Sequence, residues 1–216
     1  MSGKVTSVNV GRPAPFSTGR RVVRSAIAKR PVQGRVALRD DRVAGDEQGD
    51  PVNHGGPAQA VYAYAVEDIA FWEAELGRPL GPAFFGENLT VEGLDVNGAR
   101  IGETWRVGTA LLQVTAPRIP CAKLGARAGD PRFIKRFARA LRPGPYLAIA
   151  EPGDVAAGDA VEVVDRPPHD VTVALMAEAT VVDRAKLPLL EPSRPFWHPV
   201  VAEFLDGLDG FRLDEG

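Results

Sequence analysis

Residues 89–115 read LTVEGLDVNGARIGETWRVGTALLQVT, a stretch with three short apolar runs separated by turns. We predict strands over Leu89 to Val91, Thr104 to Val107 and Ala110 to Thr115, because glycines punctuate the chain between these runs. Strands this short, without regular alternation of strand and helix, indicate a barrel or sandwich rather than a doubly wound sheet.

The same pattern of short apolar runs separated by turns continues on both sides of this stretch. Further strands are predicted over Lys4 to Val10, Val22 to Ala28, Arg35 to Leu38, Ala60 to Ala65, Tyr146 to Ala150 and Ala160 to Val164. Two helices interrupt them. Apolar residues at steps of three and four predict the first over Glu67 to Leu76, ending at Gly77. The second is an amphipathic helix over Pro131 to Leu141. The body is therefore predicted to be mainly β.

The spacing of apolar residues changes from strand-like to helical after the proline pair at Pro167 and Pro168. We predict a domain over residues 1–165 and a small helical segment over residues 166–216. Apolar spacing favours helices over Val171 to Val182, Leu187 to Leu190 and Val200 to Leu208. The acidic tail, Asp206 to Gly216, is predicted to fray. This segment would pack beside the body and shape substrate entry or a homodimer contact.

Composition narrows the class of protein. The 216 residues are 44% hydrophobic and 25% charged, which excludes global disorder. A single cysteine excludes an internal disulfide and favours a reducing compartment. The first ten residues hold no apolar run typical of a signal peptide, and no stretch of about 18 apolar residues occurs. We therefore expect a cytoplasmic protein without a membrane anchor.

Basic residues concentrate in two segments although the net charge is only −2. Residues 18–42 hold eight Lys or Arg against two Asp, and residues 118–142 hold eight against one. Two cationic segments on an acidic chain indicate a local anion site. A small phosphate-bearing ligand suits it better than nucleic acid. The alternative is two ordinary solvated faces.

The only cysteine, Cys121, follows the sequence Pro117-Arg118-Ile119-Pro120. Proline is favoured at a helix start, so Cys121 is predicted near the beginning of a short helix. The partial positive charge there, together with Arg118, Lys123 and Arg127, would favour a thiolate, the form that binds a metal or attacks an electrophile. The alternative is a buried structural cysteine.

Three further segments are candidates for ligand contact. His54 precedes two glycines, which allow close backbone approach, and could bond a ligand or transfer a proton. Glu87 and Asn88 follow Phe84-Phe85-Gly86 and could bond the edge of a heterocycle. The basic turn Lys29 to Arg35 could hold a phosphate. For each, the alternative is a structural role in a loop.

Several familiar sites are excluded. No strand is followed by GxGxxG, and no phosphate-binding P-loop occurs. One cysteine and three dispersed histidines make neither a CxxC pair nor HExxH, so the usual zinc sites are unsupported. No GxSxG elbow is present.

Four of these segments, in order, resemble the MOSC family, named for the C-terminal domain of molybdenum-cofactor sulfurases, and within it the bacterial YiiM branch. They are Ser25-Ala26-Ile27-Ala28-Lys29-Arg30-Pro31-Val32, His54-Gly55-Gly56 with Ala60-Val61-Tyr62, Phe85-Gly86-Glu87-Asn88-Leu89, and Pro117-Arg118-Ile119-Pro120-Cys121. Together they span most of residues 1–165. The stretch after Arg166 resembles the small three-helix domain that often follows in this branch.

The resemblance implies a β-barrel body and a molybdenum cofactor whose metal is bound by Cys121. It also implies reduction of N-hydroxylated compounds, such as N-hydroxylated purine-type bases and amidoximes, a detoxifying reaction. Because the cofactor carries a phosphate and an anionic dithiolene, the expected contacts are Lys29, Arg30, Asn88, Arg118 and Lys123. His54 or Glu87 would pass a proton.

No flavin, haem or iron–sulfur motif is visible, so electrons would come from an external donor, a flavoprotein reductase being our expectation. Three other functions remain open. Cys121 could carry a persulfide in a sulfur carrier or transferase. The chain could carry the molybdenum cofactor without catalysis. Cys121 and His54 could also serve a cysteine–histidine hydrolase.

Overall fold

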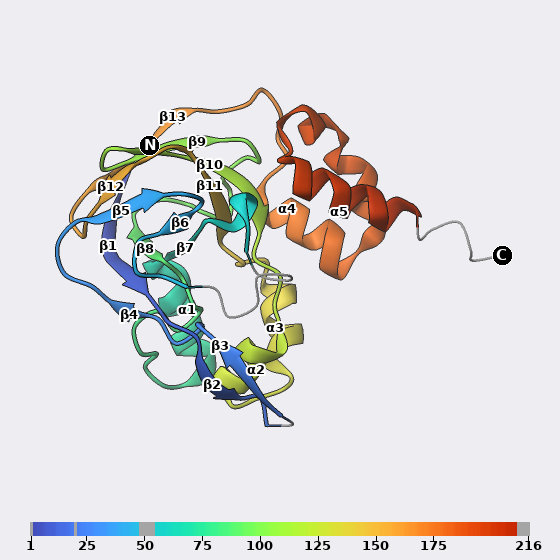
Figure 1. The fold of residues 1–216 in the computed structure, drawn as a ribbon. Coiled ribbons are helices and arrows are strands. Elements are labelled where there is room, and N and C mark those ends of the chain that lie inside the picture. The colour runs from blue at the N-terminus through green and yellow to red at the C-terminus, as the bar shows by residue number, and fades with distance from the viewer. Residues whose placement is uncertain (1, 20, 48–54, 211–216) are drawn as a thin grey trace.

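The computed structural model describes residues 2–19, 21–47 and 55–210. Seven strands close into a barrel (Figure 1). In barrel order they are β13 (Ala160–Asp165), β9 (Thr104–Val107), β10 (Ala110–Pro117), β11 (Pro145–Glu151), β7 (Val61–Ala65), β8 (Leu89–Glu92) and β1 (Ser2–Val10). Pairing of β1 with β13 closes the ring. The predicted mainly β, barrel-like body is confirmed.

One neighbouring pair in the barrel is parallel, β7 with β8, while the others are antiparallel. Parallel neighbours need a crossover connection. Helix α1 (Val66–Leu76) supplies it and buries Trp72. The helix ends at Gly77, as predicted, because this glycine adopts the left-handed conformation with φ 63°.

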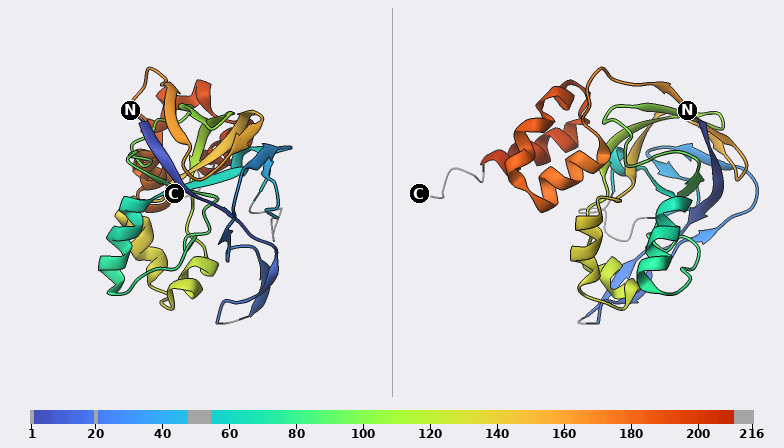
Figure 2. Two further views of the ribbon diagram at one scale, coloured as in Figure 1. Left: turned by 90° about the vertical axis from the view of Figure 1, so that its left-hand side faces the viewer. Right: turned by 180° about the vertical axis from the view of Figure 1, so that it is seen from behind.

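Shorter elements surround the barrel. Strands β2 (Ala14–Ser17) and β3 (Val22–Ser25) form a separate hairpin, β4 (Arg30–Pro31) pairs with β1, and β5 (Val36–Arg39) lies between β6 (Arg42–Val43) and β12 (Gly153–Val155). The predicted strand over Val22 to Ala28 stops at Ser25, because its partner β2 begins at Ala14, which pairs with Ser25. Helices α2 (Ala122–Ala128) and α3 (Phe133–Ala140) lie with α1 and the hairpin on one side of the barrel (Figures 1 and 2).

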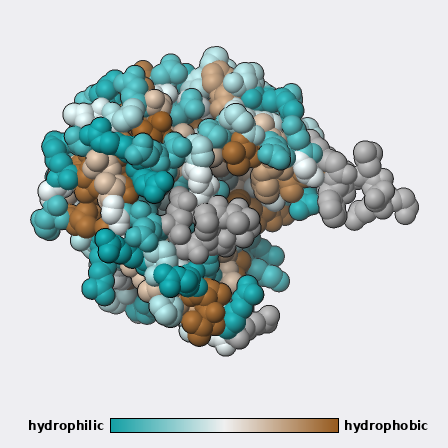
Figure 3. All heavy atoms as spheres, in the orientation of Figure 1, coloured by the Kyte–Doolittle hydropathy of each residue, from teal (hydrophilic) through white to brown (hydrophobic). Residues whose placement is uncertain are grey.

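Two apolar clusters stabilise this arrangement. The larger fills the barrel and includes Leu112 and Val114, both fully buried. The smaller is largely aromatic and joins β7, α1, α2 and α3 through Tyr64, Trp72, Leu124 and Phe137 respectively. Hydrophilic residues cover most of the face shown in Figure 3, where hydrophobic residues form separate patches. None of the helices in the described residues is both long and apolar enough to cross a bilayer.

The C-terminal segment is helical and shares the apolar core of the barrel. It comprises α4 (Val173–Ala177), a π-helix (Glu178–Val182), a 3-10 helix (Arg184–Phe196) and α5 (Pro199–Gly210). Its buried residues Met176, Leu190 and Leu205 belong to the same cluster as the barrel interior. The segment therefore packs against the barrel continuously.

Two details of this segment differ from the sequence-based predictions. The short helix predicted over Leu187 to Leu190 is part of a longer 3-10 run, because three prolines, Pro188, Pro192 and Pro195, remove backbone donors and favour the tighter winding. The tail predicted to fray from Asp206 is helical through Gly210. Residues 211–216 of that tail lie outside the described residues.

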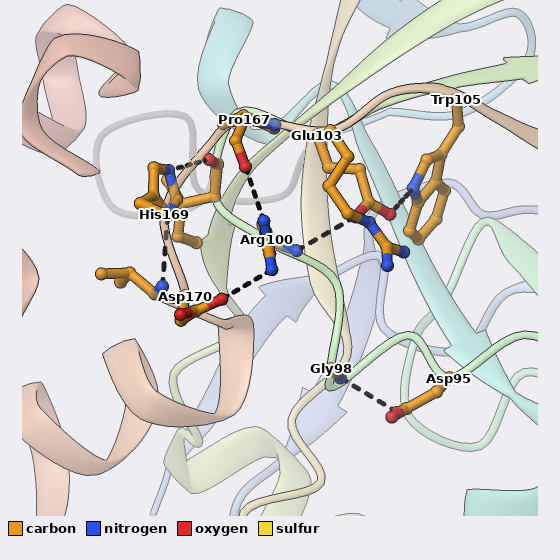
Figure 4. A network of polar contacts seen from close by, with 11 residues as sticks. Asp95, Gly98, Arg100, Glu103, Trp105, Pro167, His169 and Asp170 are labelled. Atoms are coloured by element: carbon orange, nitrogen blue, oxygen red, sulfur yellow. Dashed lines mark hydrogen bonds and ion pairs between the residues drawn. The ribbon is translucent and has the colours of Figure 1, made fainter. Parts of the chain in front are cut away.

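A polar junction ties the segment to the barrel (Figure 4). Arg100 donates to the Pro167 carbonyl at 2.8 Å and to Asp170 at 2.6 Å. The fully buried Glu103 accepts from the Trp105 indole at 2.8 Å and from Arg166 at 2.7 Å. Because each buried polar group is paired, the start of the C-terminal segment has one defined docking position.

His169 links the same two parts through both ring nitrogens. The backbone N–H of Val171 donates to Nδ1 at 3.1 Å, so Nε2 carries the proton and donates to the Ile101 carbonyl at 3.0 Å. A second ring proton would face the Val171 N–H. Burial is the largest influence and lowers the pKa of His169. The hydrogen bond to the Ile101 carbonyl opposes it, and the smaller effects of the Arg100 and Asp170 charges lower and raise the pKa respectively.

This geometry predicts a defined loss of stability in acid. The unfolded chain takes up a proton at His169 as pH falls below about 6.5, whereas the folded chain resists it, so acidification favours unfolding. His169→Phe should cost about 2 kcal/mol at pH 8, because it leaves the Ile101 carbonyl and the Val171 N–H unpaired. The variant should also lose less stability than the parent between pH 8 and 5.5. Urea unfolding measures both, and equal pH dependence of the two chains would contradict this role.

Candidate functional site

A cavity of about 110 Å³ opens where several strands end. Its walls come from the segment after β3, the loop after β6, the turn before β8, the chain between β10 and α2, and the face of β7 and β11 that points away from the barrel interior. Its polar lining residues are Ser25, Lys29, Asp46, Glu47, Gln59, Asn88, Arg118, Cys121 and Lys123, and its aromatic ones are Tyr62, Phe85 and Tyr146. Residues distant in sequence thus meet around one space.

Cys121 stands immediately before α2, where the chain turns from extended to helical conformation. Its Sγ lies 3.8 Å from Nη2 of Arg118. Burial alone would raise the pKa of the thiol. The Arg118 charge, the backbone N–H groups of Leu124 and Lys123, and the Lys123 charge together outweigh burial and lower that pKa below its ordinary value. The site therefore favours a thiolate, the nucleophilic and metal-binding form.

Arg118 is the principal cation of the site. It is only 5% exposed, and its guanidinium also donates to the Ile119 carbonyl at 3.1 Å and lies 5.7 Å from the centre of the Phe137 ring. Among the described residues no carboxylate forms an ion pair with it. A buried guanidinium without a carboxylate favours any anion in contact with it, and here the Cys121 sulfur is that neighbour.

Lys29 also lines the cavity, but its ammonium is already bound to Asp46. Both side chains are about nine-tenths buried, and burial lowers the pKa of Lys29 although Asp46 and Glu87 oppose the change. Asp46 further accepts from the Gly11 backbone at 2.7 Å and from Asn88 at 2.9 Å. The charge of Lys29 is therefore balanced by Asp46, whereas Arg118 has no carboxylate partner among the described residues.

Asn88 is held by the fold on both sides of its amide. Its Nδ2 donates to the Asn9 carbonyl and to Asp46, and its Oδ1 accepts from the Tyr62 backbone at 3.1 Å. The two amide hydrogens are thus used within the protein. Asn88 shapes the cavity wall and fixes β7 beside the turn before β8.

Glu87 lies behind this wall and is completely buried. One oxygen accepts from the Phe85 backbone at 3.1 Å and the other from the Thr90 hydroxyl at 3.3 Å. Burial is the largest influence and raises the pKa of Glu87 to about 7, while these hydrogen bonds and Arg127 act in the opposite direction. Glu87 therefore changes protonation near neutral pH, although its neighbours Gly86 and Asn88, rather than Glu87, line the cavity.

Aromatic side chains form the apolar part of the site. The Tyr62 and Tyr146 rings lie 5.3 Å apart, and the Tyr62 hydroxyl donates to the Pro143 carbonyl at 2.7 Å. Phe85 stacks on Tyr64 with centres 4.2 Å apart. Rings locked by such contacts offer fixed, flat faces to a planar ligand.

The structure brings together five of the eight predicted site residues on the cavity wall: Lys29, Asn88, Arg118, Cys121 and Lys123. Glu87 lies just behind them. Arg30 does not line the cavity and is exposed on β4, because adjacent residues of an extended chain point to opposite sides and Lys29 points inward. His54 lies outside the described residues.

Sequence reasoning missed Asp46, Tyr62, Gln59 and Tyr146 as cavity residues. Tyr62 stands in a quoted segment, and its aromatic ring in a strand beside a glycine-rich loop was a usable signal. Asp46 and Tyr146 carried none, since their position depends on contacts between segments far apart in sequence.

Sequence comparisons with known proteins identify the family to which this chain is similar. Residues 50–162 match the profile of the MOSC domain. The chain is 36% identical over 187 residues to the uncharacterized protein YflK of Bacillus subtilis, covering 87% of this chain and 85% of that one. It is 34% identical over 176 residues to protein YiiM of Escherichia coli, covering 80% and 73%. A protein of Gibberella moniliformis named reductase is 32% identical over 171 residues, which cover 76% of this chain and 30% of the reductase.

Comparison of the fold with solved structures indicates the same family. The crystal structure of YiiM from Geobacillus stearothermophilus superposes with a TM-score of 0.76 at 28% identity, covering 95% of this chain and 98% of the other. Cys121 and Arg118 fall within the matched MOSC region, whereas Lys29 and Asp46, which line the same cavity, precede it. The chain therefore belongs to the MOSC domain family, in its YiiM branch.

Proposed function

We propose that the cavity holds a molybdenum cofactor through Cys121 and that the protein reduces N-hydroxylated compounds to the parent amines. MOSC domains are associated with molybdenum-cofactor binding. The observation that carries the proposal is the pairing of the Cys121 thiol with Arg118, a buried cation that has no carboxylate partner among the described residues.

The residues present fit such a cofactor. A soft thiolate is the ligand that suits a metal already bound by sulfur, and Cys121 is the only one in the chain. The phosphate and dithiolene of the cofactor are anionic, and Arg118 and Lys123 line the same space as Cys121. Lys29 adds a third cation, partly offset by Asp46. Arg30 is not part of this proposal.

Reduction of an N–OH group consumes two electrons and two protons and releases water. When bound, the cofactor supplies the electrons, and we propose that an external flavoprotein reductase replenishes them. The rings of Tyr62, Phe85 and Tyr146 would hold a flat base or amidoxime. The Lys29 ammonium, which faces the cavity, would donate a proton to the leaving hydroxyl, and Glu87, which holds a proton near neutral pH and influences the pKa of Lys29, would then return a proton to the neutral amine.

The test is turnover by protein of verified molybdenum content. The protein, supplied with reduced viologen, would be incubated with N-hydroxylated purines, N-hydroxylated pyrimidines and amidoximes, and loss of each N–OH compound followed by chromatography. We expect conversion of at least one class to the parent amine. Metal-replete protein that converts none of them would refute the reductase. It would favour a carrier of the cofactor, and folded protein purified without molybdenum would favour a Cys121 persulfide carrier.

A further inference from the structure

Arg118 borders a second space besides the main cavity. This chamber, of about 10 Å³, lies on the side of Arg118 toward α3 and the C-terminal segment. Its other lining residues are Pro120, Phe137, Ala138, Pro143, Ala177 and Val181. None of these six carries a charge or a polar side chain, so on this side Arg118 meets apolar groups alone.

The C-terminal segment contributes Ala177 and Val181 to the chamber. Val181 belongs to the π-helix, which is wound more widely than an α-helix. Within it the Thr180 hydroxyl donates to the Met176 carbonyl at 2.7 Å, and such bonds from a threonine to the preceding turn distort helices. Thr180 therefore favours a distorted helical turn at the point where the neighbouring Val181 lines the chamber.

We propose that the C-terminal segment completes the anion site: Ala177 and Val181 keep the space behind Arg118 apolar, so that the charge of Arg118 remains available to the main cavity. A carboxylate in that chamber would pair with the guanidinium and cancel its effect on a ligand in front. Val181 is in this sense a positioning residue that acts through Arg118. The inference rests on the proposed function only in treating the main cavity as an anion site.

Val181 allows a direct test because it is 39% exposed and can be replaced without burying a charge completely. Val181→Glu places a carboxylate in the chamber beside Arg118. Val181→Gln is the control, because glutamine has nearly the same shape as glutamate but no charge. Val182→Glu places the same charge on the adjacent residue, which is 45% exposed and does not line the chamber.

The readout is the ratio of two alkylation rates at Cys121. Iodoacetate is an anion and iodoacetamide is neutral, so their rate ratio at one pH reports the local charge and divides out the reactivity of the thiol. Full-length chain from cells unable to make molybdopterin would be used at low salt. Val181→Glu should lower the ratio about fivefold relative to Val181→Gln, because one nearby charge is cancelled. Val182→Glu should stay within about twofold of the parent.

Equal ratios in Val181→Glu and Val182→Glu would overturn the inference. If Val181→Glu does not fold, Ala138→Glu compared with Ala138→Gln enters the same chamber from α3 and decides the question in the same way. Because alkylation needs no cofactor, the outcome is separate from the proposed function. A chain that never binds molybdenum could still show the fivefold effect, and an active reductase could lack it.

Discussion

Cys121→Ala is expected to abolish turnover, with a loss of at least about a thousandfold, while leaving the fold intact. The thiol is the proposed metal ligand and the charge partner of Arg118 at 3.8 Å. The Leu124 N–H also donates to the Cys121 backbone carbonyl at 3.0 Å, a bond that alanine keeps at the start of α2, so alanine should cost little stability. Turnover per folded chain, with unfolding by urea alongside, measures both effects.

Cys121→Ser is the matched control. It keeps the size and polarity of the side chain but replaces the soft sulfur with a hard, uncharged oxygen, so it should be as inactive as alanine. A serine variant with activity near that of the parent would show that the thiolate is dispensable. That result would refute the ligand assignment without touching the fold.

Glu87→Gln should lower kcat about a hundredfold, the usual scale for loss of a proton donor. The pKa of Glu87 is about 7, so the parent should lose activity as pH rises through 7, and the glutamine variant should lack that limb. Thr90→Val is the control, because the Thr90 hydroxyl stabilises the charged carboxylate. It should keep turnover and move the limb to higher pH.

The same substitution makes a prediction about stability with a defined sign. In the folded chain Glu87 holds its proton up to about pH 7, whereas its ordinary pKa is 4.5. The contribution of Glu87 to the stability of the parent should therefore fall as pH rises from about 4.5 to 7, opposite in sign to that of His169, since only the unfolded chain releases the Glu87 proton in that range. Glu87→Gln should flatten this dependence. For catalysis, a hundredfold loss of kcat in Glu87→Gln with the pH profile of activity unchanged from the parent would contradict the role of Glu87 in proton transfer.

Local patterns predicted much of the fold. The spacing of Ile69, Trp72 and Leu76 indicated α1, and Gly77 marked its end, because helix periodicity and left-handed caps are encoded in neighbouring residues. Closure of the barrel depends on the pairing of β1 with β13, about 160 residues apart, and came only from the family resemblance. The single 3-10 run over Arg184 to Phe196 was missed because apolar spacing was read without its prolines.

For the site, residue type indicated Cys121, Arg118 and Lys123, since cations beside the only cysteine form a chemical pattern within six residues. Arg30, predicted as a cofactor contact, does not line the cavity, because charge clustering in sequence ignores the alternation of an extended chain. The commitment of Lys29 to Asp46 and the raised pKa of Glu87 were invisible in the sequence. Both arise from burial between segments that meet only in the fold.

The content of molybdenum and pterin in purified, folded protein from molybdenum-replete cells tests the central claim most directly. We predict that the parent chain retains both in equal, stoichiometric amounts, and that Cys121→Ala retains much less molybdenum. Folded parent protein without either component, or a Cys121→Ala variant with molybdenum equal to the parent, would contradict the assignment of this cavity as a molybdenum-cofactor site.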